Sequence, residues 1–146
     1  MNRTHSRFRL LWLCLLVLPL LAACPSTGGS RQLNALQSAQ YDWSAAIRWG
    51  DFEGALSLVD PQRQQTHPVS AVQFSRYQQV QISGYTELGS RMTANGLGAQ
   101  REIEIGVINR NTMAERTVRH TETWSYDASA KRWWNTSGLP DLWAGE

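Results

Sequence analysis

The spacing of apolar residues changes from a helical period to a strand period near residue 78, and this change constrains the fold most. Before residue 78, apolar side chains recur every three or four residues, which is typical of helices that bury one face. After it, they alternate with polar residues, which is typical of half-buried strands. Helices followed by a run of antiparallel strands predict an α+β fold in which the N-terminal helices pack on one face of a sheet.

Three helices are predicted in the first half of the chain. Ser30 is a candidate N-cap for a helix over residues 31–49. A second helix is predicted over 52–60 and a third over 70–79, with a loop at 61–68 between them. The residues expected to face the core are Leu33, Leu36, Trp43, Ala46, Ile47, Phe52, Ala55, Leu56, Val59, Val72 and Tyr77.

Four strands are predicted over residues 79–88, 101–109, 112–127 and 132–137. The Asn95-Gly96 pair is a turn signal between the first two strands. Gly84 predicts a bulge in the first strand. In the second strand, alternation sets one face with Ile103, Ile105 and Val107 against the opposite face with Glu102 and Glu104.

The long third strand carries the titratable residues of most interest. Its even positions share one face and read Ala114, Val118, His120, Trp124 and Tyr126. Glu122 falls on the same face, and Arg116 is a candidate to neutralise it. A pair of His120 and Glu122 suggests a functional site. A pair of Glu122 and Arg116 suggests a structural ion pair or a solvent-exposed strand end, and the sequence leaves both interpretations open.

Two segments resemble the NTF2-like, cystatin-like family. Residues 41–61 (YDWSAAIRWGDFEGALSLVDP) resemble its opening helices, and residues 121–139 (TETWSYDASAKRWWNTSGL) resemble its closing hairpin. The likeness spans roughly residues 32 to 138. It implies a cone in which a strongly curved antiparallel sheet wraps a long helix and often leaves a pocket at its open end. Members include isomerases and dehydratases as well as non-catalytic binding and assembly modules, so the fold does not choose between them.

The resemblance implies that an enzyme of this kind places an Asp or His base in the pocket, opposite a Tyr or a second acid. The candidate pocket residues are His120, Trp124, Tyr126 and Tyr85. His120 is either a general base or ligand anchor, or a histidine at the edge of the core that bonds a neighbour. No residue is assigned as catalytic, cofactor-binding or metal-ligating, because no carboxylate cluster has ligand spacing and His67 lies 53 residues from His120. No cofactor is expected.

The N-terminus has the pattern of a processed export signal. Three arginines precede a twelve-residue apolar run over residues 10–21, which is shorter than the roughly 20 residues that a membrane span needs. The sequence LAAC over residues 21–24 resembles a bacterial lipobox, which predicts lipidation of Cys24. The alternative is an ordinary signal peptide cleaved near Ala23.

Processing at this site predicts three segments: a lipoprotein signal peptide at 1–23, the lipidated cysteine and a flexible tether at 24–31, and one NTF2-like domain at 32–146. The tether would hold the domain close to the membrane surface, facing the periplasm, and Pro25 favours the outer membrane. Without the three arginines of the signal, eleven basic residues remain against twelve acidic ones. This balance, with no basic run, excludes a nucleic-acid-binding protein.

Adjacent tryptophans near the C-terminus pose a packing problem. Trp133 and Trp134 cannot both face inward in a strand, because neighbours alternate between faces. Either the tail with Leu142 and Trp143 covers the outward ring, or that ring marks a partner surface together with Arg132. Insertion of the ring into lipid headgroups is a third interpretation.

These observations predict a membrane-anchored envelope lipoprotein that acts as a non-catalytic binding or accessory module. Its partner would be another envelope protein or a second copy, engaged through the open face of the sheet. The alternative is a binder of a small apolar molecule, or an isomerase-like or dehydratase-like enzyme that uses the cone pocket around His120.

Overall fold

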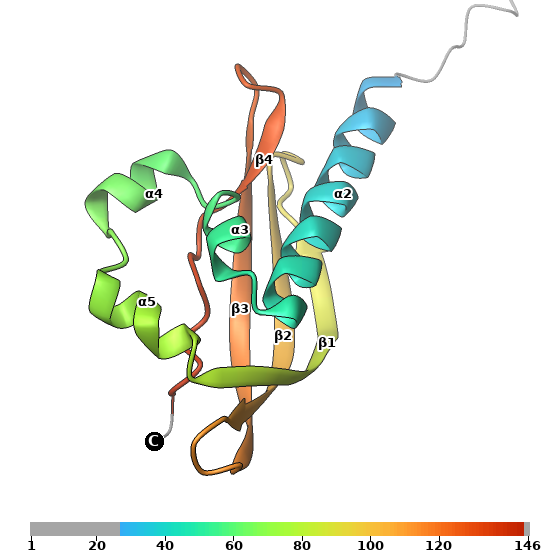
Figure 1. The fold of residues 1–146 in the computed structure, drawn as a ribbon. Helices are drawn as coiled ribbons and strands as arrows, with labels where there is room; N and C mark the ends of the chain where they lie inside the picture. Colours follow the sequence, from blue (N-terminus) through green and yellow to red (C-terminus); the bar gives the residue numbers. More distant parts are fainter. Residues whose placement is uncertain (1–26, 145–146) are drawn as a thin grey trace, which may run out of the picture. The chain divides into compact units, whose positions relative to one another are not determined.

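The computed structural model describes residues 27–144. The chain divides into two units, residues 1–33 and 34–146, and the sheet lies in the second. There, helices precede a four-stranded antiparallel sheet with strand order β1-β2-β3-β4 (Figure 1). This arrangement confirms the predicted α+β fold. The predicted signal peptide and Cys24 lie outside the described residues.

Four helices precede the sheet: α2 (Thr27–Trp49), α3 (Phe52–Leu56), α4 (Pro61–Thr66) and α5 (Ala71–Tyr77). Helix α2 begins four residues earlier than the predicted start at residue 31, so the last part of the predicted tether is helical. Helix α5 begins after Ser70, whose hydroxyl and backbone form a capping box with Gln73. Among residues 27–144, no helix combines the length and the apolar composition that a membrane span requires.

Two predicted segments in this region are wrong. The second helix ends at Leu56 rather than at residue 60, because the chain then bonds to the sheet: the Asn135 amide donates to the Leu58 carbonyl and the Asp60 amide donates to the Asn135 carbonyl. The predicted loop at 61–68 contains α4, which Asp60 caps and Pro61 opens. Val72, expected in the core, is exposed, whereas Tyr77 is buried as predicted.

The strands are β1 (Val80–Met92), β2 (Gly98–Asn109), β3 (Glu115–Asp127) and β4 (Arg132–Asn135). The β1–β2 pairing shifts register between Ile82 and Gly84, where a bulge was predicted, and again between Glu87 and Gly89. The connection between these strands contains Asn95 and Gly96, the predicted turn. Strand β1 reaches four residues beyond its predicted end, while β3 and β4 are shorter than predicted.

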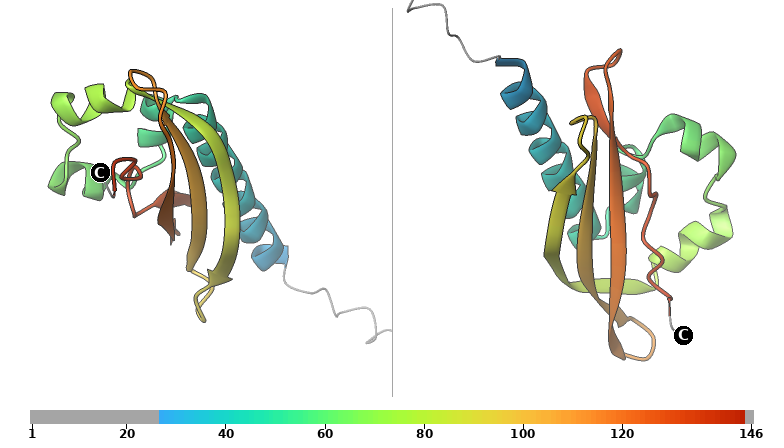
Figure 2. Two further views of the ribbon diagram at one scale, coloured as in Figure 1. Left: turned by 90° about the horizontal axis from the view of Figure 1, so that it is seen from below. Right: turned by 180° about the vertical axis from the view of Figure 1, so that it is seen from behind.

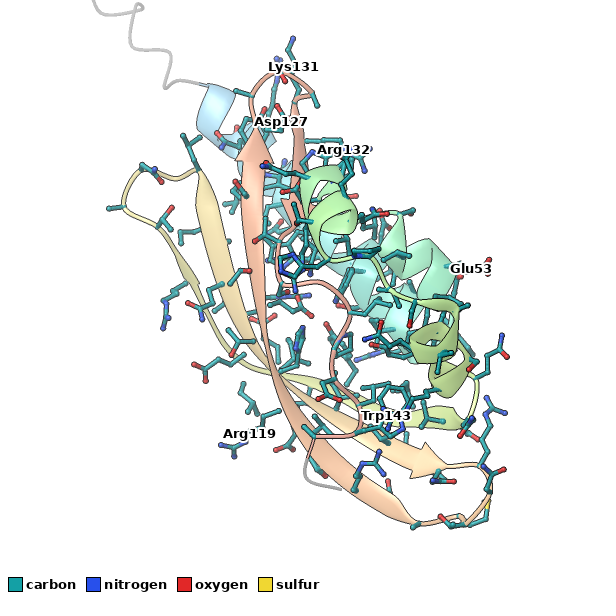
Figure 3. The ribbon with its side chains drawn as sticks, turned by 90° about the vertical axis from the view of Figure 1, so that its left-hand side faces the viewer. Glu53, Arg119, Asp127, Lys131, Arg132 and Trp143 are labelled. Atoms are coloured by element: carbon teal, nitrogen blue, oxygen red, sulfur yellow. The ribbon has the colours of Figure 1, made fainter. Side chains whose placement is uncertain are left out.

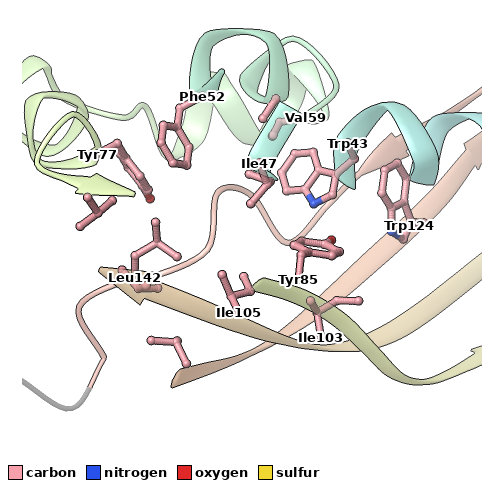
Figure 4. Packing of buried hydrophobic residues seen from close by; sticks show 14 of the residues in the cluster. Trp43, Ile47, Phe52, Val59, Tyr77, Tyr85, Ile103, Ile105, Trp124 and Leu142 are labelled. Carbon is pink, nitrogen blue, oxygen red and sulfur yellow. The ribbon is translucent and has the colours of Figure 1, made fainter. Parts of the chain in front are cut away.

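The core lies between the helices and the inner face of the curved sheet, which is the face that the helices cover (Figure 2). Trp43 and Ile47 of α2 are fully buried, as are Ile103, Ile105 and Val107 of β2, so the predicted alternation of β2 is confirmed. The predicted core residue Leu33 is exposed. The rings of Trp43 and Trp124 meet edge to face, with centroids 6.0 Å apart (Figure 4).

Candidate functional site

A buried ion pair lies inside the sheet, where an apolar core would be expected. Glu122 of β3 is fully buried, and Arg101 of β2, its direct partner in the strand register, is nearly so. Arg101 donates to Glu122 Oε2 from Nε at 3.0 Å and from Nη2 at 2.7 Å. Such a pair is stable in a low-dielectric site only when further hydrogen bonds satisfy the remaining polar atoms.

Those further bonds are present around both groups. The Tyr85 hydroxyl donates to Glu122 Oε1, and the Trp124 indole donates to Oε2 at 3.1 Å. Arg101 also donates to the hydroxyl of Ser44 on α2 at 3.2 Å, and its Nη1 lies 3.4 Å from a carboxylate oxygen of Glu87. We call Glu122, Arg101, Tyr85 and Trp124 the polar cluster.

The polar cluster favours structure over acid–base chemistry. Burial, followed by the adjacent carboxylate of Glu122, raises the pKa of Tyr85 well above its ordinary value of 10. The tyrosine therefore stays protonated and acts as a hydrogen-bond donor. Both oxygens of Glu122 accept hydrogen bonds within the protein and the side chain is fully buried, so this carboxylate is not exposed to a substrate.

His120 lies on the inner face of β3, opposite Ile103 of β2. Its ring is half-buried, and its Nε2 has no hydrogen-bond partner among the described residues. Burial lowers the pKa of His120 below its ordinary value, although the neighbouring Glu122 acts in the opposite direction. His120 therefore shares its face with the polar cluster, and no hydrogen bond joins it to Glu122.

Beside the polar cluster, a hollow of about 400 Å³ opens between α2 and β1, and we call it the α2–β1 hollow. Tyr85, Glu87 and Arg101 form its sheet side. Tyr41 and Trp49 line its helix side and are 74% and 87% exposed. Arg48, between them on α2, donates to the Tyr85 carbonyl at 2.8 Å. The hollow thus has a polar base and two exposed aromatic rings at its helical wall.

The adjacent tryptophans of β4 point to opposite faces, as strand geometry requires. Trp133 is buried, with its ring centroid 5.4 Å from that of Tyr126, so Tyr126 packs against β4. Trp134 is half-buried, and the guanidinium carbon of Arg132 lies 3.8 Å above its ring centroid. The outward ring is therefore Trp134, partly covered by its own strand neighbour.

The C-terminal tail packs elsewhere. Leu142 is fully buried, and its carbonyl accepts a hydrogen bond from Arg116 Nε at 3.1 Å. Trp143 packs on Tyr77 of α5, with centroids 4.9 Å apart. Figure 3 shows Trp143 and Arg132 in separate parts of the molecule. The tail therefore covers α5 rather than Trp134. Arg116 bonds the backbone of the tail, and the cation that neutralises Glu122 is Arg101.

Sequence reasoning missed the cation that pairs with Glu122. Arg101 precedes the alternating Ile103, Ile105 and Val107 by two residues, so extending the same alternation would have placed it on the inner face. Within residues 27–144, no group of three or more His, Cys, Asp and Glu side chains is placed to hold a metal ion.

No family model and no curated protein matches this sequence. Among solved structures, a SEC-C motif containing protein from Psychrobacter arcticus matches with a TM-score of 0.54 and 9% identity, over 74% of this chain and 63% of that one. A SEC-C motif containing protein from Rhodopseudomonas palustris matches with a TM-score of 0.51 and 18% identity, over 65% and 70%. An NTF2-like family member from Streptomyces avermitilis gives a TM-score of 0.41 at 12% identity, over 76% and 99%. At these identities the likeness concerns the fold alone.

Proposed function

We propose that this chain is a lipid-anchored protein of the bacterial cell envelope whose NTF2-like domain binds a protein partner and catalyses no reaction. The observation that carries the proposal is the pair of exposed aromatic rings, Tyr41 and Trp49, at the α2–β1 hollow. Aromatic residues are enriched among those that dominate the energy of protein interfaces. The LAAC sequence that ends at Cys24 supports the anchor.

The chemistry at the base of this hollow supports binding rather than catalysis. Arg101 and Tyr85 reach the hollow, but both are held by hydrogen bonds to Glu122. A general base or acid must exchange protons with a substrate, and these groups bond one another instead. The polar cluster is better suited to fixing the shape of the wall that a partner contacts.

The surface proposed for the partner is α2 rather than the open face of the sheet. The outer face of the sheet carries polar and charged side chains, including Glu102, Thr117, Arg119 and Thr121. Strand β1, which flanks the hollow, is also an edge strand of the sheet formed by the described residues. The partner is either another envelope protein or a second copy of this chain.

Native mass spectrometry of the lipidated protein, extracted from its own membranes, tests this proposal. A homodimer or a defined hetero-complex is expected, and Trp49→Ser should dissociate it. Trp134→Ser is the matched control, because it removes the other outward-facing tryptophan. A strictly monomeric protein, or a complex that survives Trp49→Ser but not Trp134→Ser, would overturn the assignment of the surface.

The anchor is tested separately. Cys24→Ser should move the protein from the membrane fraction to the soluble periplasmic fraction, and the mass of the mature protein should lose its acyl chains. A Cys24→Ser protein that stays in the membrane fraction at the parent level would contradict the proposed lipidation.

One observation favours a second function, a small-molecule site in the cone. The buried Nε2 of His120 has no partner among the described residues, and a ligand could supply one. This function predicts that a small molecule copurifies with the protein and is lost in His120→Gln, with the protein assembly unchanged.

A further inference from the structure

A second hollow, of about 710 Å³, lies between α4, α5 and the C-terminal segment, and we call it the α4–α5 hollow. It shares no lining residue with the α2–β1 hollow. The ribbon shows α4 and α5 on the side of the molecule away from α2, with the C-terminal segment passing beside them (Figures 1 and 2). Its volume falls in the range of pockets that hold small organic molecules.

Arg63 of α4 is the informative residue in this hollow. Its side chain is half-buried and lines the wall. Among residues 27–144, its guanidinium has neither a hydrogen-bond partner nor an ion-pair partner. This differs from Arg101, which is bonded on several sides. A partly desolvated guanidinium with five donors and no acceptor is complementary to a carboxylate, sulfonate or phosphate group.

The backbone of the tail is shaped around this guanidinium. Gly138 has a φ of +81°, and a Cβ placed there would lie 2.7 Å from Arg63 Nε. The positive φ favours glycine, and any other residue here would also push the guanidinium of Arg63 aside. The Gly138 amide donates to Asn135 Oδ1 at 2.8 Å, which fixes the turn to the end of β4.

The other walls combine apolar and polar side chains and carry one more arginine. Leu56 and Leu139 line the hollow, together with the ring of Trp143. The guanidinium carbon of Arg76 lies 4.4 Å from the centroid of that ring. Asp141 is the acidic residue of the wall, and its Oδ1 accepts the Trp143 amide. Two arginines against one aspartate leave the wall with a positive balance.

We propose that the α4–α5 hollow binds a small organic anion, with its acidic group on Arg63 and its apolar body against Leu56, Leu139 and Trp143. This site goes beyond the proposed protein contact on α2 and does not depend on it. Its ligand is an aromatic or aliphatic acid rather than a free inorganic anion, because Leu56, Leu139 and Trp143 offer apolar surface in the same hollow as the guanidinium.

Calorimetric titration tests this proposal on the full-length chain in phosphatidylcholine nanodiscs, with empty nanodiscs as the blank. The probes are 2-naphthoate, its neutral analogue 2-naphthamide, and inorganic phosphate. Saturable one-to-one binding of 2-naphthoate is expected, with 2-naphthamide and phosphate each at least about tenfold weaker, since one lacks the charge and the other lacks the apolar body.

Variants localise the binding. Arg63→Gln should lower the affinity for 2-naphthoate by about tenfold to a hundredfold, which is the range expected for losing hydrogen bonds to a charged group. Gly138→Ala should weaken it as well, because the new methyl group displaces the guanidinium. Arg119→Gln is the matched control, since this arginine is 80% exposed on the outer sheet face, and it should leave binding unchanged.

Several results would overturn the proposal. These are equal affinity for 2-naphthoate and 2-naphthamide, an Arg63→Gln affinity within about threefold of the parent, or no saturable binding of 2-naphthoate at about 5 mM. Because the comparison of charged and neutral probes uses the parent protein, it decides the question even if a variant folds poorly.

Discussion

Arg101 is buried and Arg63 is half-buried, and the two arginines differ in their hydrogen-bond partners. Arg101, inside the sheet, donates to Glu122 and Ser44 and lies near Glu87. Arg63, in the α4–α5 hollow, has no acceptor among the described residues. A buried charge with all its partners in the protein belongs to the fold, whereas a half-buried guanidinium without an acceptor in the protein is open to water or a ligand.

The same contrast separates the two regions as wholes. The inner face of the sheet contains several titratable residues, yet its buried carboxylate, Glu122, already accepts hydrogen bonds from Arg101, Tyr85 and Trp124. Among the described residues, the α4–α5 hollow has no buried carboxylate of this kind, yet the guanidinium of Arg63 is open to a ligand. The presence of titratable residues on the inner face is therefore weaker evidence of function here than the state of their hydrogen bonds.

The largest expected effect comes from breaking the buried ion pair. Glu122→Gln keeps the shape of the side chain but leaves Arg101 buried without its main counter-charge, which should lower the free energy of unfolding by about 3 kcal/mol or more. The measurement is urea unfolding followed by tryptophan fluorescence.

The double variant Arg101→Met/Glu122→Leu gives the control for this prediction. It removes both charges and fills the space with apolar groups. It should therefore lower the free energy of unfolding by less than the sum of the losses in the two single variants. A Glu122→Gln protein within about 1 kcal/mol of the parent would mean that the ion pair does not hold the sheet together.

Much of the fold could be predicted because local signals agreed with the final packing. The predicted inward orientation of Ile103, Ile105 and Val107 was confirmed, because the burial of one sheet face fixes the strand register. Ser70 begins α5 because its side chain satisfies an amide of the first turn. Gly84 was recognised as a bulge because a residue without a side chain packs poorly in a strand.

Helix α4 was missed because it has no apolar periodicity and is held by polar contacts to the preceding residues. The side-chain amide of Gln64 donates from Nε2 to the carbonyls of Leu56 and Val59 at 2.9 Å, which joins the helix to α3 and the following turn. The Asp60-Pro61 start was the one local signal present. Without α4, the hollow that contains Arg63 could not be predicted, since it forms only where α4, α5 and the tail meet.

A smaller effect should appear in the pH dependence of stability, and His120 is its source. Burial lowers the pKa of His120 in the folded protein, while the unfolded chain has the ordinary value near 6.5. Between these two values the unfolded state binds a proton that the folded state does not, so stability is full above about pH 6.5 and falls on acidification.

Urea unfolding at pH 7.5 and 5.5 measures this effect, with a limiting slope of about 1.4 kcal/mol per pH unit. His120→Gln should flatten the profile, and His67→Gln, which removes an exposed imidazole, should leave it unchanged. Glu122 faces His120 and favours its charged form, so the slope should stay below the limit. An unchanged profile in His120→Gln would show that the inner face admits the charged ring without penalty.

The smallest effect on stability is expected from the residue proposed to matter most for a ligand. Arg63→Gln removes a charge that has no partner among residues 27–144, so the free energy of unfolding should change by no more than about 0.5 kcal/mol. Urea unfolding beside Glu122→Gln makes this comparison directly. A loss of several kcal/mol in Arg63→Gln would place this arginine with Arg101, as a group that holds the fold. A neutral change combined with lost binding of 2-naphthoate would separate the two: Arg101 would hold the fold, and Arg63 would hold the ligand.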